Sequence, residues 1–127
     1  MNEREFTSLI NSPADVRYNY FIKRVADYEE VWVIVDENNN VMLTKDDEGR
    51  DLIPMWPFKA FADYCIEESM INCSSEAIDL SEFMDEFLPD IENYEILPSV
   101  FWNLEDSGVL TVKDLLRDLN NELLSYK

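Results

Sequence analysis

Histidine is absent from the 127-residue sequence, and glycine and cysteine occur only twice each. Without histidine the chain has no imidazole to transfer protons, no Ser-His-Asp or Cys-His pair, and no histidine ligand for zinc. Two cysteines cannot form a four-cysteine zinc site, and two isolated glycines cannot form a phosphate-binding glycine loop. These absences exclude most common enzyme classes, so we expect a protein that is not an enzyme and that uses no cofactor.

Lysine and arginine are missing from a long central segment, between Lys59 and Lys113. The 53 residues from 60 to 112 contain thirteen acidic residues, and the whole chain has a formal net charge of −18. A field of this sign repels nucleic acid and anionic membranes, and it attracts cations or a basic protein surface. We therefore expect a basic protein partner, and neither nucleic acid nor a membrane.

Long apolar runs are also lacking. The longest strongly apolar run, residues 31–35, is far shorter than the roughly 20 residues of a membrane-spanning helix. Residues 1–5 carry charges where a signal peptide would have an apolar stretch. Because a secreted scaffold of this size usually has more cysteines, we expect a cytoplasmic protein in which Cys65 and Cys73 are reduced thiols, with Cys65 buried.

Enough apolar material is present for a core, because 46% of the residues are hydrophobic and 13% are aromatic. A chain of this length fits a single domain, residues 1–127. Apolar residues at three- and four-residue spacing predict a helix over residues 3–10 and a second helix that ends near Tyr28. Ser12 is the predicted N-cap of the second helix, and Pro13 its first residue.

Three further helices are predicted after residue 56. The first begins at Pro57, and the second covers residues 80–88, where Pro89 closes it. Asp79 and Glu82 have the spacing of a capping box for this second helix. The last helix begins at residue 112, with Thr111 as its cap.

β-branched and aromatic residues predict the strands. Residues 31–35, 41–44 and 52–56 are separated by the turn sequences 38–40 and 46–49, which favours three antiparallel strands in a meander. Residues 96–102 form another predicted strand, at a sheet edge because it contains Pro98, and residues 109–110 add a short one. The predicted fold class is α+β, with an antiparallel sheet of four or five strands and helices packed on one face.

Acidic residues on two predicted helices lie opposite the apolar stripes, which indicates a solvated face. Paired carboxylates act in catalysis when one of them is desolvated, and this placement does not favour such a site. A solvated acidic face serves solubility in many proteins, but thirteen acids without one cation exceed that need, and a binding role is favoured. The candidate partner-binding residues are Asp63, Glu67, Glu68, Glu82, Asp85 and Glu86.

Two turn sequences carry clustered polar residues. Asp36, Asn38 and Asn40 have the spacing that opens a calcium loop, but the required glycine and final glutamate are missing, so a hairpin tip is the favoured interpretation. Asp46, Asp47 and Arg50 lie around the second turn, where a local hydrogen-bond network is favoured over a binding site.

Five sequence blocks carry a resemblance to a known family. In order along the chain they are residues 31–32, 46–57 (DDEGRDLIPMWP), 78–80 with Phe83, 100–101, and 112–119. Together these blocks are similar to an uncharacterised bacterial family called domain of unknown function 2750. Two positions depart from the family pattern. Phe58 stands where a polar residue or a histidine is expected, and Trp102 stands where a proline is expected. The resemblance implies a compact domain without an assigned activity.

The leading hypothesis is a non-catalytic, cytoplasmic protein-binding domain that presents an acidic face to a basic partner. Its sharpest form is an immunity-type role, in which the protein neutralises a cationic toxin or nuclease. One alternative is a DNA mimic that inhibits a nucleic-acid-binding protein, which would need two rows of carboxylates with phosphate-like spacing. Another is a carboxylate-only enzyme or a divalent-metal binder.

Overall fold

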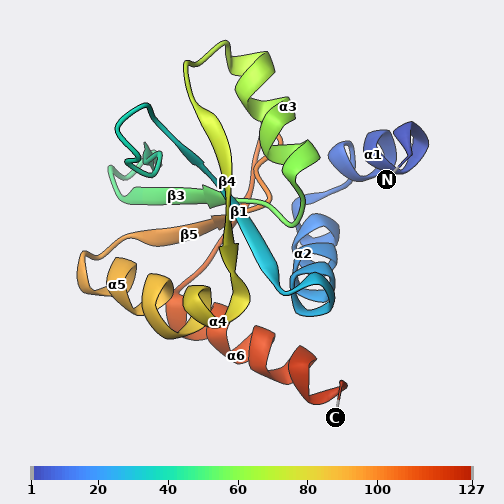
Figure 1. Cartoon of the computed structure of the whole chain (residues 1–127), viewed down its shortest axis with the longest axis vertical. Helices are drawn as coiled ribbons and strands as arrows, with labels where there is room; N and C mark the ends of the chain where they lie inside the picture. The colour runs from blue at the N-terminus through green and yellow to red at the C-terminus, as the bar shows by residue number, and fades with distance from the viewer. Residues whose placement is uncertain (1, 127) are drawn as a thin grey trace.

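Groups of helices and groups of strands follow one another along the chain (Figure 1). The computed structural model describes residues 2–126 and confirms the α+β class. The elements are α1 (Glu3–Ile10), α2 (Ala14–Tyr28), β1 (Glu30–Val35), β2 (Thr44–Lys45), β3 (Asp51–Met55), α3 (Lys59–Ser69), β4 (Ser74–Asp79), α4 (Leu80–Glu82), a π-helical turn (Phe83–Phe87), α5 (Leu88–Asn93), β5 (Leu97–Val100), β6 (Gly108–Val109) and α6 (Val112–Leu124).

The strands form two sheets, so the predicted single antiparallel sheet is wrong. β1 and β4 pair in an antiparallel two-stranded sheet, and the other sheet has the order β2-β3-β5-β6. Within this second sheet β3 and β5 are parallel, with Leu52 opposite Leu97. Parallel neighbours need a long crossover, and the segment from α3 through α5 supplies it.

β1 connects the two sheets. The backbone N–H and C=O of Trp32 both bond to Trp56, at 2.8 Å each, and Val35 forms a bridge with Val41. The second half of the predicted meander is confirmed, because β2 and β3 pair antiparallel. The first half is reduced to short contacts between β1 and residues 41–42, because β1 pairs over its full length with β4. β4 has the polar sequence Ser-Ser-Glu-Ala-Ile-Asp, and such a sequence lacks the apolar alternation that predicts strands.

β5 is an interior strand, which corrects the edge position predicted from Pro98. β5 lies between β3 and β6. Pro98 is opposite Ile53 of β3, but the pairing with β6 begins only at Ser99 and continues at Val100. The missing N–H of Pro98 therefore removes no hydrogen bond from the β6 side, which explains how an interior strand contains a proline.

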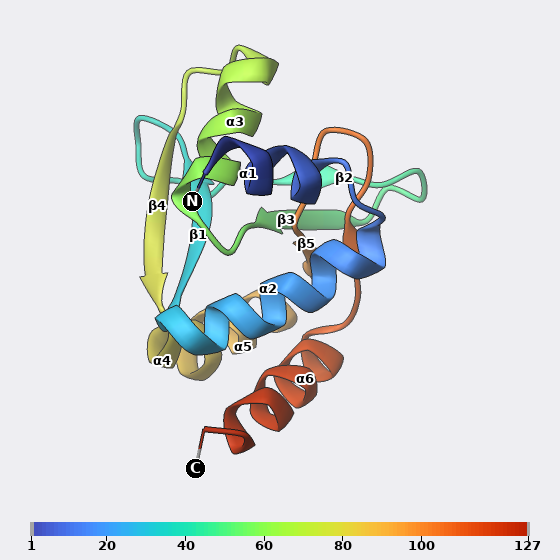
Figure 2. The same ribbon diagram turned by 90° about the vertical axis from the view of Figure 1, so that its right-hand side faces the viewer.

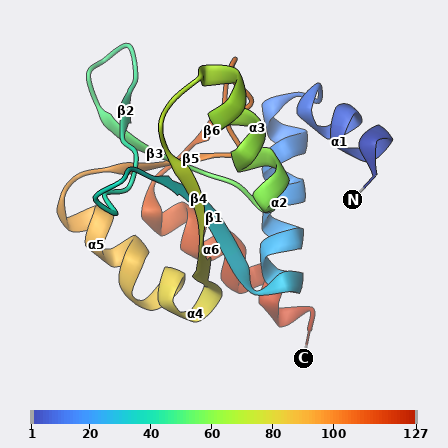
Figure 3. The same ribbon diagram turned by 45° about the horizontal axis from the view of Figure 1, so that its top comes forward.

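Helices lie against both faces of the β1–β4 sheet, and not against one face as predicted (Figure 3). On one face the Ser75 hydroxyl of β4 donates to Asp63 of α3, at 2.7 Å. On the other face Val33 and Ile78 lie opposite the helical run α4–α5. Coverage on both faces explains why β1 reads as an uninterrupted apolar run.

Two predicted helix starts are shifted in the structure. Ser12 does not cap α2; its hydroxyl donates to the Ser8 carbonyl at 2.7 Å, and Pro13 occupies the N-cap position. α3 begins at Lys59, two residues after Pro57. The predicted caps Asp79 and Thr111 are confirmed, because their side chains accept bonds from the first turns of α4 and α6.

Pro89 does not close its helix, which continues to Asn93. A π-helical turn precedes it, and the Leu88 N–H bonds to the Phe83 carbonyl five residues back. In a regular α-helix the proline ring would clash with the carbonyl four residues earlier. The wider π-helical turn gives the ring room, so the proline is accommodated inside the helical run.

The core lies where the two sheets meet the helices. Its largest fully buried side chains include Trp56, Phe21, Phe61 and Phe101. The prediction that Cys65 is buried is confirmed; burial raises the pKa of its thiol to about 12. Across residues 2–126 no helix combines the length and the apolar character that a bilayer crossing needs.

Candidate binding groove

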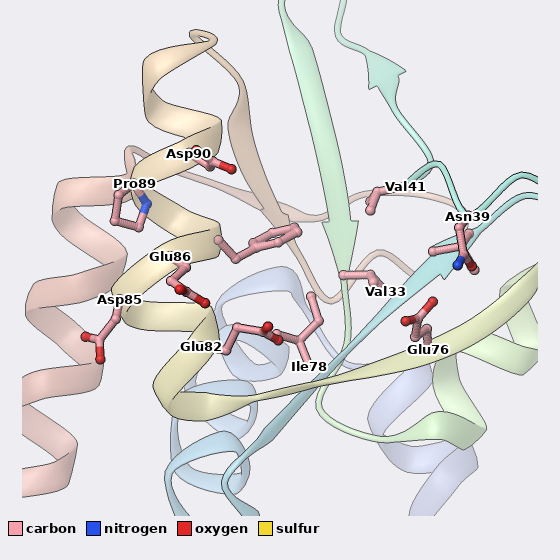
Figure 4. A pocket seen from close by; sticks show the side chains of 12 residues that line it. Val33, Asn39, Val41, Glu76, Ile78, Glu82, Asp85, Glu86, Pro89 and Asp90 are labelled. Atoms are coloured by element: carbon pink, nitrogen blue, oxygen red, sulfur yellow. The ribbon is translucent and has the colours of Figure 1, made fainter.

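A groove of about 680 Å³ lies between the β1–β4 sheet and the helical run α4–α5 (Figure 4). Apolar side chains from both walls form its floor, and carboxylates form its rim. The loop after β1 adds Asn39 and Val41 at one end. The apolar lining residues are Val33, Val35, Val41, Ile78, Phe87 and Pro89, and the acidic ones are Glu76, Glu82, Asp85, Glu86 and Asp90.

Strand alternation produces the sheet wall of the groove. Val33 is opposite Glu76 in the register between β1 and β4, and Val31 is opposite Ile78. Successive side chains of a strand point to opposite faces, so Val33, Glu76 and Ile78 share the face that looks toward the helices. The apolar side chains on this face are the floor, and Glu76 places a carboxylate beside them.

The helical wall carries the remaining acids. Glu82 and Glu86 are four residues apart, a spacing that places side chains on the same face of a helix. In Figure 4 both point toward β1 and β4, whereas the carboxylate of Asp85 points away from the strands. No lysine or arginine is among the residues that line the groove within the described chain. The rim is therefore a concentrated region of negative charge over an apolar floor.

The structure brings together three of the six predicted binding residues and separates the other three from them. Glu82, Asp85 and Glu86 line the groove. Asp63, Glu67 and Glu68 lie on α3, which packs on the opposite face of β4. Glu76 and Asp90 line the groove as well and were not predicted as binding residues. Glu76 was missed because β4 was not predicted as a strand, so its side chain could not be placed on a sheet face.

Asp63 has a structural role on α3. Its carboxylate accepts hydrogen bonds from the Lys59 ammonium and from the Ser75 hydroxyl, both at 2.7 Å. Partial burial opposes ionisation, but the bonds from Lys59 and Ser75 outweigh it and lower the pKa of Asp63. Of the thirteen acids in the cation-free segment, only Asp63 and Asp106 belong to ion pairs among the described residues.

Replacing Asp63 with asparagine is expected to lower the free energy of unfolding at neutral pH by about 0.5 kcal/mol, as for other exposed ion pairs. A carboxyl whose pKa is lowered in the folded state contributes stability above its unfolded pKa of about 3.9 and loses it at lower pH. The difference between wild type and Asp63→Asn should therefore narrow as the pH falls below about 4. Urea unfolding of both proteins between neutral pH and pH values below 4 measures this difference in the free energy of unfolding, with Glu67→Gln as the control. A difference that stayed constant with pH would contradict the assignment.

The two polar turns are explained by their own hydrogen bonds. Asp36 accepts from the N–H groups of Asn38 and Asn40, at 2.9 and 3.0 Å, and these bonds lower its pKa. Asp46 accepts from the N–H and the guanidinium of Arg50, at 2.9 and 2.6 Å. The predicted turn network is therefore confirmed for Asp46 and Arg50, whereas Asp47 takes no part in these bonds. Within residues 2–126 no group of three or more potential metal ligands is gathered in one place.

Comparison with protein-family models gives a match over residues 18–119 to the family described as "Protein of unknown function (DUF2750)". The chain belongs to this family. A search of the curated proteins found no match. The matched range contains every residue that lines the groove, so the groove is built from the DUF2750 part of the chain.

Proposed function

We propose that this DUF2750 protein is a non-catalytic binding protein, and that its acidic groove receives a cationic segment of a basic partner protein. The observation that carries the proposal is the combination of an apolar floor with five carboxylates and no cation among the lining residues. Such a surface complements a segment that has both basic and apolar side chains.

The two parts of the groove would contribute differently to binding. Apolar side chains of the partner would bury surface against Ile78 and Phe87, which are only partly buried, at about 25 cal/mol for each Å² removed from water. The carboxylates would steer the approach of the partner and raise affinity mainly by speeding association. The apolar floor also favours this proposal over a DNA mimic, whose surface would consist of carboxylates alone.

The proposed setting is the cytoplasm, and the sharpest form of the proposal is an immunity-type role against a cationic toxin or nuclease. In that form the groove would cover a basic surface that the toxin needs for its own target. Association of the protein with the toxin should then slow steeply with added salt, because charges more than about 8 Å apart are screened at physiological ionic strength.

Two synthetic peptides test the proposal. One alternates lysine with valine and favours an extended strand, and the other places lysine and leucine on opposite faces of a helix. We expect at least one of them to bind, and the triple variant Glu76→Gln, Glu82→Gln, Glu86→Gln to bind it roughly 30-fold more weakly at low salt. This estimate takes about 0.7 kcal/mol for each charge pair.

A matched control separates the groove from the overall charge. The triple variant Glu3→Gln, Glu48→Gln, Glu105→Gln removes the same number of charges from exposed positions outside the groove. It should keep nearly the wild-type affinity. Equal weakening by the two variants would reject the groove as the binding site, as would a failure of both peptides to bind the wild type.

A further inference from the structure

The outer edge of β4 has no strand beside it. Among residues 2–126, β4 pairs only with β1. In Figure 2 it lies at the margin of the molecule, with β1 on its inner side. An unpaired edge presents a row of N–H and C=O groups that can pair with another chain.

The hydrogen bonds of β1 show which groups of β4 point outward. Trp32 directs its N–H and C=O to Trp56, and the Ile34 carbonyl accepts from Met42, so both residues face away from β4. Their partners in the register are Ala77 and Ser75. Residues directly opposite each other in an antiparallel pair either exchange both bonds or exchange none. The backbone groups of Ser75 and Ala77 therefore point away from β1, toward the open edge.

The edge carries few of the devices that usually block strand addition. The six residues of β4 include no proline and no lysine, and Ala77 is exposed. Its only charges are the carboxylates of Glu76 and Asp79, in a stretch of chain that has no cation. A negative edge repels a negative strand, but it does not repel a positive one.

We infer that the edge of β4 accepts an extended basic segment of the partner protein as an added β-strand. This inference rests on the proposed function and specifies how the partner binds. Side chains on one face of the added strand would lie beside Glu76 and Ile78 and enter the groove. Those on the other face would lie beside Ser75, near Asp63 of α3 and the Lys59 ammonium that pairs with it. The favourable charge for a basic segment would therefore come from the groove face, where Glu76, Glu82 and Glu86 lie.

The negative charge of β4 and of the whole chain favours a basic segment, and not a second copy of this chain, as the added strand. Pairing two β4 edges would bring Glu76 and Asp79 of one copy beside those of the other, and each copy has a net charge of −18. Like charges directly opposite each other in a sheet are destabilising. A lysine-rich strand meets the same carboxylates with favourable charge, and its backbone supplies the partners that Ser75 and Ala77 lack.

Strand addition is tested by comparing the binding of the lysine–valine peptide with the binding of two N-methylated forms of the same peptide. In one form the odd-numbered residues are N-methylated, and in the other the even-numbered residues. Both forms keep the charge and lose the same number of donors, but only one set of N–H groups faces β4 in a bound strand. We expect one form to bind at least tenfold more weakly than the parent and the other to bind like it. Amide exchange of Ser75 and Ala77 should slow at least tenfold in the complex.

The possible results separate this inference from the proposed function. If only the helical peptide binds, or if both N-methylated forms bind like the parent without slower exchange, strand addition is wrong and the groove proposal stands. If neither peptide binds, or if the groove variant binds as well as wild type, the proposed function fails and this inference fails with it. If the protein alone is a dimer in sedimentation and its Ser75 and Ala77 amides are protected, the edge belongs to a second copy, and the inference is overturned.

Discussion

Replacing Arg17 with alanine is expected to lower the free energy of unfolding by about 4 kcal/mol, through a buried cavity and lost hydrogen bonds. The Arg17 side chain is 0% exposed and is among the largest fully buried side chains of the protein. It donates to the carbonyls of Phe101 and Ser12, at 2.8 and 3.2 Å, and it pairs with the Asp106 carboxylate. Removing it leaves the buried Phe101 carbonyl without this charged donor.

The backbone of Phe101 adds to this effect. Its φ angle is 55°, in the left-handed region that costs a non-glycine residue roughly 1–2 kcal/mol. Phe101 is held there by the bond from Arg17 to its carbonyl and by its own N–H, which donates to Met55 at 2.8 Å. Without Arg17 one of these two restraints is lost, and the strained conformation is less well supported.

Three further variants identify the source of the loss. Arg17→Lys keeps the charge but not the planar fork, so it should recover less than half of the stability. Asp106→Asn should cost about 1 kcal/mol, because the Asp106 side chain is 61% exposed. Arg24→Ala removes a partly exposed cation from the same helix and is the control, with an expected change below about 1 kcal/mol. Equal losses for Arg17→Ala and Arg24→Ala in urea unfolding would contradict the role of Arg17.

Elements specified by local sequence were predicted well. β1 consists of β-branched and aromatic residues, and the helices carry apolar residues at helical spacing, so both are visible in a short window. The Thr111 cap of α6 is equally local, since its side chain bonds to Asp114 only three residues away. The same reasoning assigned the Asp46 turn and its bond to Arg50.

Elements specified by contacts between distant segments were missed. β4 is a strand because it pairs with β1, whose residues lie 39 to 49 positions earlier, and its own sequence is polar. The parallel pairing of β3 with β5 likewise depends on how the intervening segment folds. Strand propensity reports mainly the burial of a residue and its cross-strand neighbours, which a single sequence does not display.

The residues of the candidate groove also divide into those that local sequence could predict and those that depend on contacts between distant segments. Glu82 and Glu86 were found because a helix places residues four apart on one face. Their neighbour Glu76 comes from β4, so its position in the groove could be found only from the fold. The acids of α3 looked equivalent in the sequence, yet β4 separates them from the groove.

Replacing Trp56 with alanine is the second large change, with an expected loss of about 4 kcal/mol in the free energy of unfolding. Trp56 is fully buried at the junction of the two sheets, and its indole Nε1–H donates to the Trp102 carbonyl at 2.8 Å. The thiol of Cys65 reaches the same carbonyl at a sulfur–oxygen distance of 3.4 Å. The alanine variant loses the buried ring and leaves that carbonyl only the weak thiol donor.

The backbone bonds between Trp56 and Trp32 do not depend on either side chain, so they should persist in both variants. Trp32→Ala is therefore the matched control: it changes the other residue of the same bridge, but its ring is only partly buried and its Nε1–H donates to Glu30 at 3.2 Å near the surface. We expect it to cost roughly half as much as Trp56→Ala. Trp56→Phe keeps most of the buried area and loses the hydrogen bond, so it should fall between wild type and Trp56→Ala, near 2 kcal/mol. Urea unfolding followed by circular dichroism measures all three variants. A loss for Trp32→Ala as large as that for Trp56→Ala would contradict the larger contribution assigned to the buried indole of Trp56.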